Sequence, residues 1–146
     1  MQMMQYGKNT DDLFAELKVE KNVGNYLERN QNEFAVPLNE YLSKLLIEKK
    51  LIKSEVIKQS GLTGEYAYHI FSSDRKNPSR PKVLALGLAM QLNLDELQYL
   101  LKYAKQNPLY PRNPWDSVVI FAVEHRLNVS ETNELLHQAG ETLLLE

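Results

Sequence analysis

Apolar residues recur along most of this chain at intervals of three and four positions, the spacing that gathers them on one face of an α-helix. The pattern is clearest in two segments, which carry Leu38, Leu42, Leu45 and Leu46 and then Leu97, Leu100, Leu101 and Ala104. Strict alternation of apolar and polar residues, the mark of a half-buried strand, does not occur over any convincing length. The pattern therefore predicts an all-α protein.

The runs end at polar, glycine or proline residues, and these breaks set the expected helix boundaries. We expect helices near residues 10–17, 22–29, 37–50, 55–59, 63–71, 82–91, 95–104, 116–126 and 130–139. Ser54, Asp95 and Ser130 are the expected N-caps. Loops are expected at 30–33 and 72–81, and three prolines make 107–114 a non-helical connector. We expect no internal repeat.

A length of 146 residues suits one compact domain with short extensions. We expect an N-terminal helical extension over 1–35, a central domain over 36–106 and a C-terminal helical hairpin over 107–146 that packs on it. The sequence has no cysteine, which excludes disulfides and thiolate chemistry. No stretch reaches the ~20 apolar residues of a membrane helix, and residues 1–10 lack the apolar core of a signal peptide. We expect a cytoplasmic protein that does not contact membranes.

The net charge is only −2, but its distribution is uneven. Residues 35–85 hold nine Lys and Arg against five Asp and Glu, whereas residues 86–146 hold four against eight. A basic middle between acidic flanks is compatible with a local contact to a polyanion, and also with ordinary scatter on a solvated surface.

The most informative stretch, residues 53–79, predicts a short helix, a tight turn and a second helix. Gly61 supplies the residue that tolerates a positive φ at such a turn. Small or apolar residues fall where the two helices would cross: Val56, Ile57, Leu62, Ala67 and Ile70. The second helix keeps one face free, and a helix of this size fits the DNA major groove.

These residues resemble the helix-turn-helix of the phage-repressor and Cro family of bacteria and their phages, often called XRE-type. The resemblance covers residues 38–104 and is carried by Gln59-Ser60-Gly61-Leu62-Thr63, then Asn77-Pro78-Ser79, then Leu92, Leu94 and Asp95-Glu96-Leu97. It implies a repressor-like five-helix helix-turn-helix domain within the all-α chain. The implied function is a transcriptional regulator that binds double-stranded DNA, as a homodimer on two half-sites.

The family's site residues carry over by position. Bases would be read by Thr63, Gly64, Glu65, Tyr68 and His69 on the third helix of the domain. Phosphates would be contacted by Lys53, Ser54, Lys58, Arg75, Lys76, Arg80 and Lys82. The sequence departs from the family in its reading helix, since Glu65 adds a negative charge and Gly64 has no side chain to read bases.

An alternative follows from that departure, namely a protein-interaction adaptor on the same fold. Tyr66, Tyr68 and Phe71 would then anchor a protein partner. The helices from Asp116 onward would supply dimer or partner contacts, and Leu143 to Leu145 would either extend a dimer interface or pack as a terminus. We expect Trp115 to anchor the connector.

Chemistry beyond binding has little support in the sequence. His69, His125 and His137 are far apart and lack companions at metal-ligand spacing. Glu65 and Asp74 have no nucleophile or phosphate loop beside them. We expect no enzyme activity, no metal and no cofactor.

Overall fold

The computed structural model describes residues 8–34, 37–72 and 78–145, and within them every regular element is helical. The all-α class predicted from the sequence is confirmed. None of the described helices combines the length and the apolar character needed to cross a membrane. The α-helices are α1 Thr10–Val19, α2 Val23–Arg29, α3 Leu38–Glu48, α4 Lys53–Ser60, α5 Gly64–Phe71, α6 Arg80–Ala89, α7 Leu94–Tyr103, α8 Pro114–Glu124 and α9 Val129–Gln138, with the 3-10 turn η1 Gln31–Glu33 after α2.

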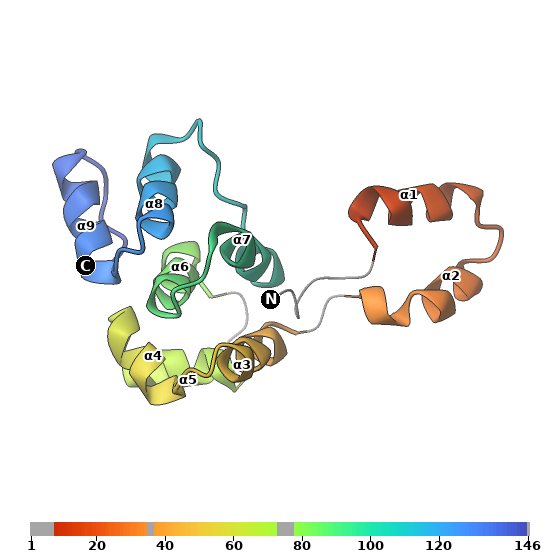
Figure 1. Cartoon of the computed structure of the whole chain (residues 1–146), viewed down its shortest axis with the longest axis horizontal. Helices are drawn as coiled ribbons and strands as arrows, with labels where there is room; N and C mark the ends of the chain where they lie inside the picture. The colour runs from red at the N-terminus through yellow and green to blue at the C-terminus, as the bar shows by residue number, and fades with distance from the viewer. Residues whose placement is uncertain (1–7, 35–36, 73–77, 146) are drawn as a thin grey trace. The chain divides into compact units, whose positions relative to one another are not determined.

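The chain divides into two compact units, an N-terminal unit over residues 1–36 and a C-terminal unit over residues 37–146. In the N-terminal unit, α1 and α2 run antiparallel beside each other (Figure 1). Tyr26 is the one apolar side chain buried among the described residues of this unit, and its ring meets Phe34 edge-on at 6.3 Å between centroids. The buried apolar surface of the unit is therefore small.

Polar contacts around Glu16 tie the two helices of the N-terminal unit together. Lys8 Nζ donates to Glu16 Oε2 at 2.7 Å, and the side-chain amide of Asn30 donates to Glu16 Oε1 at 3.1 Å. Arg29 bridges Glu16 and Glu20, at 3.1 and 2.8 Å from its Nη2. The bonds from Lys8 and Asn30 are the main cause that lowers the pKa of Glu16 to about 2.

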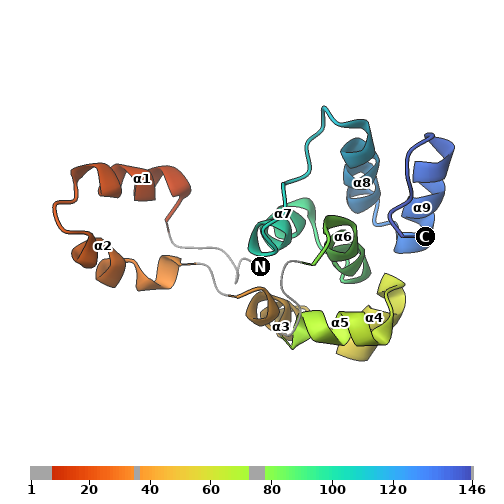
Figure 2. The same ribbon diagram turned by 180° about the vertical axis from the view of Figure 1, so that it is seen from behind.

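Helix α6 lies at the centre of the C-terminal unit. It packs against α4, α7 and α9, while α3 contacts α5 and α7, and α8 contacts α7 and α9 (Figures 1 and 2). Every residue of α6 from Val83 to Leu88 is buried. A short helix that is apolar all round can only exist inside such a shell, so α6 fixes where its neighbours sit.

The crossing of α6 and α7 depends on Gly87. A Cβ atom built on Gly87 would collide with Cδ1 of Leu97, whose side chain is completely buried. The missing side chain lets the two backbones approach closely. Gly87 is thus required by packing, in contrast to Gly64 at the start of α5, where a Cβ would meet nothing within 4 Å.

The expected N-caps Ser54, Asp95 and Ser130 are wrong. Helix α7 is capped by Asn93 and α9 by Asn128, and each cap forms a reciprocal capping box with a glutamate three residues later. The box satisfies two helix-end N–H groups together. Helix α4 begins after Ile52, which makes no side-chain cap.

The connections α6–α7 and α8–α9 share a turn and a cap. Asn93 and Asn128 are the two caps with a capping box. Two residues before each cap, one residue adopts a positive φ, 56° at Gln91 and 57° at Arg126. Lys50, two residues before the cap position of α4, has the same φ of 56°, so this turn also joins α3 to α4.

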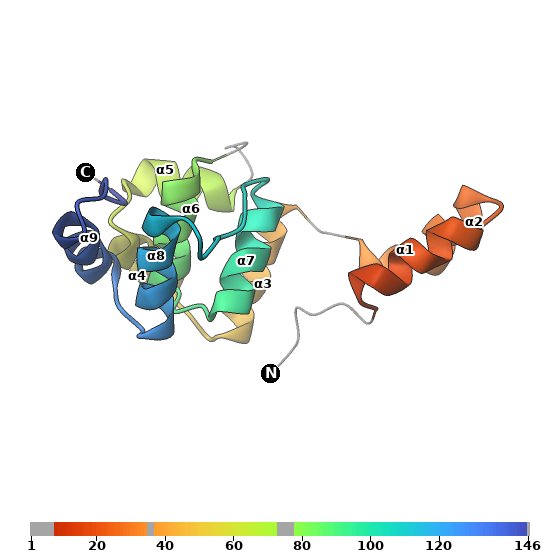
Figure 3. The ribbon, with the colours of Figure 1, turned by 90° about the horizontal axis from the view of Figure 1, so that it is seen from above.

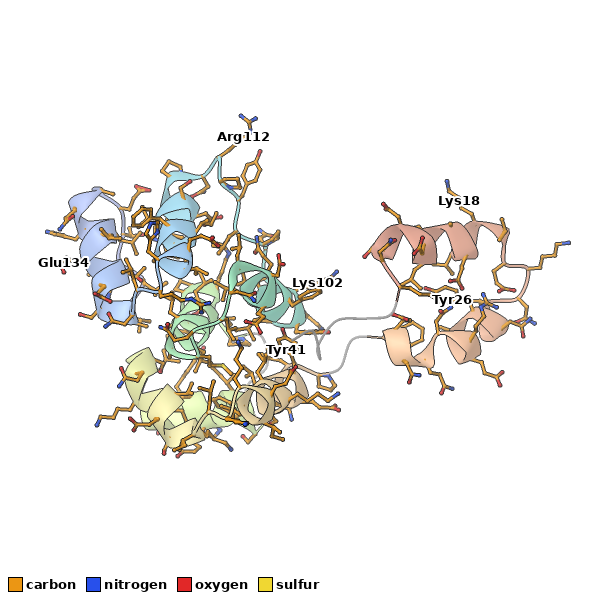
Figure 4. All side chains as sticks on the ribbon, in the orientation of Figure 1. Lys18, Tyr26, Tyr41, Lys102, Arg112 and Glu134 are labelled. Carbon is orange, nitrogen blue, oxygen red and sulfur yellow. The ribbon has the colours of Figure 1, made fainter. Side chains whose placement is uncertain are left out.

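The structure adds detail in two further places. Tyr41, labelled in Figure 4, lies beside the apolar stripe of α3 and is completely buried, with its ring centroid 4.4 Å from that of Tyr103. Residues 31–33 were expected as loop and form the 3-10 turn η1. Packing against a distant part of the same unit buries Tyr41, whereas a local backbone turn forms η1.

We expect Gly87→Ala to destabilise the C-terminal unit by about 1–3 kcal/mol, the usual cost of overpacking a filled core. Gly64→Ala, placed in open space, should leave stability unchanged or slightly higher. Urea unfolding followed by the fluorescence of Trp115, the single tryptophan, measures both. Equal stabilities for the two variants would show that the α6–α7 crossing tolerates a side chain.

We also expect the N-terminal unit to weaken in acid because the folded pKa of Glu16 is lowered from 4.5 to about 2. A lowered pKa means that the stabilisation is fully present above pH 4.5 and is lost as the pH falls through about 2. A carboxyl-resonance NMR titration of Glu16 measures this directly. Titration of Glu16 at its ordinary pKa of 4.5 would contradict the ion-pair geometry. Glu16→Gln should reduce the pH dependence but not remove it, because the hydrogen bond from Arg29 also lowers the pKa of Glu20.

Candidate nucleic-acid interface

Helix α5 lies along one edge of the C-terminal unit, and no described helix of that unit covers its outer side (Figures 1 and 3). Its inner face is formed by Ala67, Ile70 and Phe71, which are all buried. The turn before it contains Gly61 at a φ of 76°, as a tight bend between α4 and α5 requires. The inner face and the turn together fix which side of α5 faces outward.

All five predicted base-reading residues lie on the exposed side of α5. Thr63 is the N-cap and accepts from the backbone N–H of Tyr66, a start that the sequence predicted correctly. Gly64 and Glu65 follow in the first turn, and the Glu65 side chain is 88% exposed. Tyr68 and His69 continue the surface, with His69 Nε2 at 3.9 Å from Glu65 Oε1.

Ser72, one turn beyond Tyr68, extends this surface. It is the exposed C-cap of α5. The sequence prediction did not include Ser72 among the site residues, although the helix ends at Phe71 as expected. The spacing of four residues from Tyr68 is the signal that could have found it.

Cations from two neighbouring helices flank α5. Lys53, at the start of α4, holds its Nζ 5.9 Å from the ring centroid of Tyr68. Lys82, on α6, holds its Nζ 4.2 Å from the ring centroid of Tyr66. A lysine over an aromatic face is attracted by the ring quadrupole while its ammonium keeps contact with solvent. The two rings thus position positive charge on both sides of the helix.

The other predicted phosphate contacts differ in their placement. Ser54 and Lys58 are exposed on α4. Arg75 and Lys76 lie outside the described residues. Arg80 is drawn inward, and its guanidinium makes two bonds of 2.9 Å to the two carboxylate oxygens of Asp116. The structure therefore brings Lys53, Lys58 and Lys82 to the surface near α5 but not Arg80.

Arg80 instead organises the connector before α8. It donates to the backbone carbonyls of Asn107 and Pro108, each at 3.0 Å, and lies 5.8 Å from the Trp115 ring centroid. Asp116, its partner, is only 5% exposed and also accepts from the backbone N–H of Tyr110. Trp115 donates its indole N–H to the carbonyl of Thr142, so it anchors both the connector and the end of the chain.

The C-terminal tail packs as a terminus beside α9 and does not project outward. Asn133 accepts from Leu144 N at 2.7 Å and donates to Leu145 O at 2.9 Å, and Leu144 is buried. A Cβ on Gly61 would lie 3.3 Å from Cδ1 of Leu145, so the tail reaches the turn between α4 and α5. The end of the chain supports the turn that orients α5.

These positions bear on the protein-interaction alternative and on metal binding. Phe71 is buried and cannot serve as an exposed anchor for a protein partner, which leaves Tyr66 and Tyr68 for that role. Among the described residues, no group of three His, Asp or Glu side chains is close enough to hold a metal ion.

Comparison with protein-family models, with curated proteins and with solved structures gave no match.

We expect Arg80→Gln to destabilise the C-terminal unit by up to about 3 kcal/mol, because it leaves the buried Asp116 carboxylate without its cation. The low end of the range for buried pairs applies, since the Arg80 side chain is still 21% exposed. Lys82→Gln is the matched control and should change stability little. Chemical unfolding measures both, and Asp116→Asn should recover part of the loss in the Arg80→Gln background.

Proposed function

We propose that this chain is a DNA-binding transcriptional regulator of the phage-repressor (XRE) type, and that α5 enters the major groove. The observation that carries the proposal is the outward face of α5, which is exposed along its length between two flanking lysines. An α-helix fits the major groove of B-DNA, and cations beside it can contact the phosphate backbone. The α4–α5 pair would be its helix-turn-helix.

In this proposal the residues divide their work. Lys53, Lys58 and Lys82 contact phosphates and set the position of the helix, without selecting a sequence. Glu65 and His69 reach base edges, where a carboxylate accepts from the amino group of cytosine. The exposed N-terminus of α5 adds a partial positive charge that is favourable near the phosphate backbone of the DNA.

The carboxylate of Glu65 makes this interface less cationic than a purely phosphate-binding surface. Non-specific affinity should consequently be low, because counterion release scales with the number of phosphates neutralised. A single module of this kind would depend on a second copy and a second half-site for useful affinity. Dimer binding to a two-fold symmetric operator is therefore part of the proposal.

Three variants test the interface and a fourth, Arg112→Gln, is the control. Affinity for double-stranded DNA is measured by fluorescence anisotropy across salt concentrations. Lys53→Gln and Lys58→Gln should each weaken binding to all sequences and reduce the salt slope by about one. Arg112→Gln removes a cation on the side of the unit opposite α5 (Figure 4), and it should change nothing. Glu65→Gln should raise affinity for non-cognate DNA and alter base preference.

A pool of random duplexes supplies the cognate site by selection. Failure of the full chain to bind any duplex at about 50 mM salt, where phosphate contacts are strong, would sink the proposal. Retention of a stoichiometric protein through Tyr66 and Tyr68 in its place would favour the adaptor.

A further inference from the structure

The N-terminal unit exposes large apolar side chains that a stable protein normally covers. On α1, Phe14 is 61% and Leu17 44% exposed, and on α2, Val23 is 64% and Leu27 47% exposed. Exposed apolar residues are common singly, but four from two adjacent helices form a surface of the kind that marks an interface.

These four residues lie on one side of the hairpin. Each helix turns by about 100° per residue, so Phe14 and Leu17 lie together on one side of the half-buried residues of α1. On α2, Val23 and Leu27 lie together on one side of the buried Tyr26. Since α1 and α2 are antiparallel (Figure 1), the two pairs fall on the same face. We call this set of four the apolar face.

The opposite side of the hairpin carries the ion pairs. Glu16, Glu20 and Arg29 bind one another there, together with Lys8. This polar side is complete in itself, because its charges are matched within the unit. The apolar face has no such complement among the described residues of the unit.

The unit is too small to be stable with that face in water. Its described residues bury Tyr26 as their one apolar side chain, and surface ion pairs such as those of Glu16 contribute little. Domains below about 40 residues usually need disulfides, metals or oligomerisation. The sequence has no cysteine, and no metal-binding cluster lies in the described residues. Oligomerisation is the remaining route.

We propose that the apolar face pairs with the same face of a second copy of this chain, so that two hairpins form a four-helix bundle. Two antiparallel helix pairs meeting through apolar faces are a standard way to build such a bundle. A two-fold axis between positions 14 and 15 of α1 brings the same residues together from both copies, as a symmetric interface requires.

Charge at the border of the face supports a copy of the same chain as the occupant. Asp11 and Lys18 lie seven positions apart, two turns along the same outer edge of α1. If the two α1 helices run antiparallel, with the axis between positions 14 and 15, Asp11 stands opposite Lys18 of the second copy. The pairing occurs twice because of the symmetry, and a parallel arrangement would oppose like charges.

The inference deepens the proposed function and rests on it only for the use of the dimer on two half-sites. It also changes where the dimer contact is expected. The sequence suggested the helices from Asp116 onward, but Val119, Ala122 and Leu136 of those helices are buried within their own unit. Within its own unit, by contrast, the apolar face of the N-terminal unit stays uncovered.

The test measures the mass of the full chain in solution by sedimentation equilibrium, without DNA. The wild-type chain should be a dimer, and Leu17→Glu should weaken the dimer at least about 30-fold, as loss of a central apolar contact typically does. Val19→Glu is the matched control. Val19 is 78% exposed but lies on the polar side of α1, about 140° from Phe14, so this variant should remain dimeric.

A charge exchange keeps the test decisive even if Leu17→Glu unfolds the hairpin. Asp11→Lys and Lys18→Asp should each weaken the dimer about two- to five-fold, as exposed ion pairs do. The double variant should bind its second copy more tightly than either single variant, although both exchanged charges now oppose the dipole of α1. A monomeric wild-type chain overturns the inference, whether its own C-terminal unit or another protein covers the apolar face. A dimer whose affinity changes neither with Leu17→Glu nor with the charge exchange also overturns it.

The DNA assay separates this inference from the proposed function. A dimer that the variants weaken as expected, but that binds no duplex, supports the dimer interface and contradicts the proposed DNA-binding function. A monomer that binds single half-sites supports DNA binding and contradicts the dimer interface.

Discussion

The burial of α6 is the constraint on which the C-terminal unit depends. Six consecutive residues of this helix, from Val83 to Leu88, are hidden from solvent, so neighbours must cover it on all sides. Gly87 sets how closely α7 approaches, because Leu97 occupies the space of its absent side chain. The helices α3 and α4 then hold α5 at the edge through Ala67 and its buried neighbours. The exposed face of α5 is thus a consequence of what lies beneath it.

The sequence predicted most of what depends on local periodicity. The helices, the start of α5 near Thr63 and most of the connector, which ends at Asn113, came from spacing and from residue type. The outward face of α5 followed from the positions of Ala67 and Ile70. Local rules also allowed errors of two residues. Asn93 and Asn128 outcompete the acidic or hydroxyl residues behind them, because each makes a reciprocal box with a glutamate.

What the sequence could not predict depends on partners far away in the chain. Arg80 looked like a phosphate contact because it sits among other cations, but the residue that captures it, Asp116, is 36 positions distant. Nothing in the local charge pattern distinguishes an arginine that folds inward from a lysine that stays outside. The same holds for Leu145, whose contact with the turn at Gly61 joins the end of the chain to its middle.

The two units solve opposite physical problems. The C-terminal unit buries its apolar surface internally and leaves a helix with charged and aromatic groups outside, as suits a polyanionic ligand that is bound and released. The N-terminal unit satisfies its charges internally, through Glu16 and Arg29, and leaves apolar side chains outside. Salt weakens the contacts of the first kind but not hydrophobic association of the second kind. If the proposed dimer and the proposed DNA contact both hold, the dimer stays intact at salt concentrations that release it from DNA, and each binding event involves two copies of α5 at once.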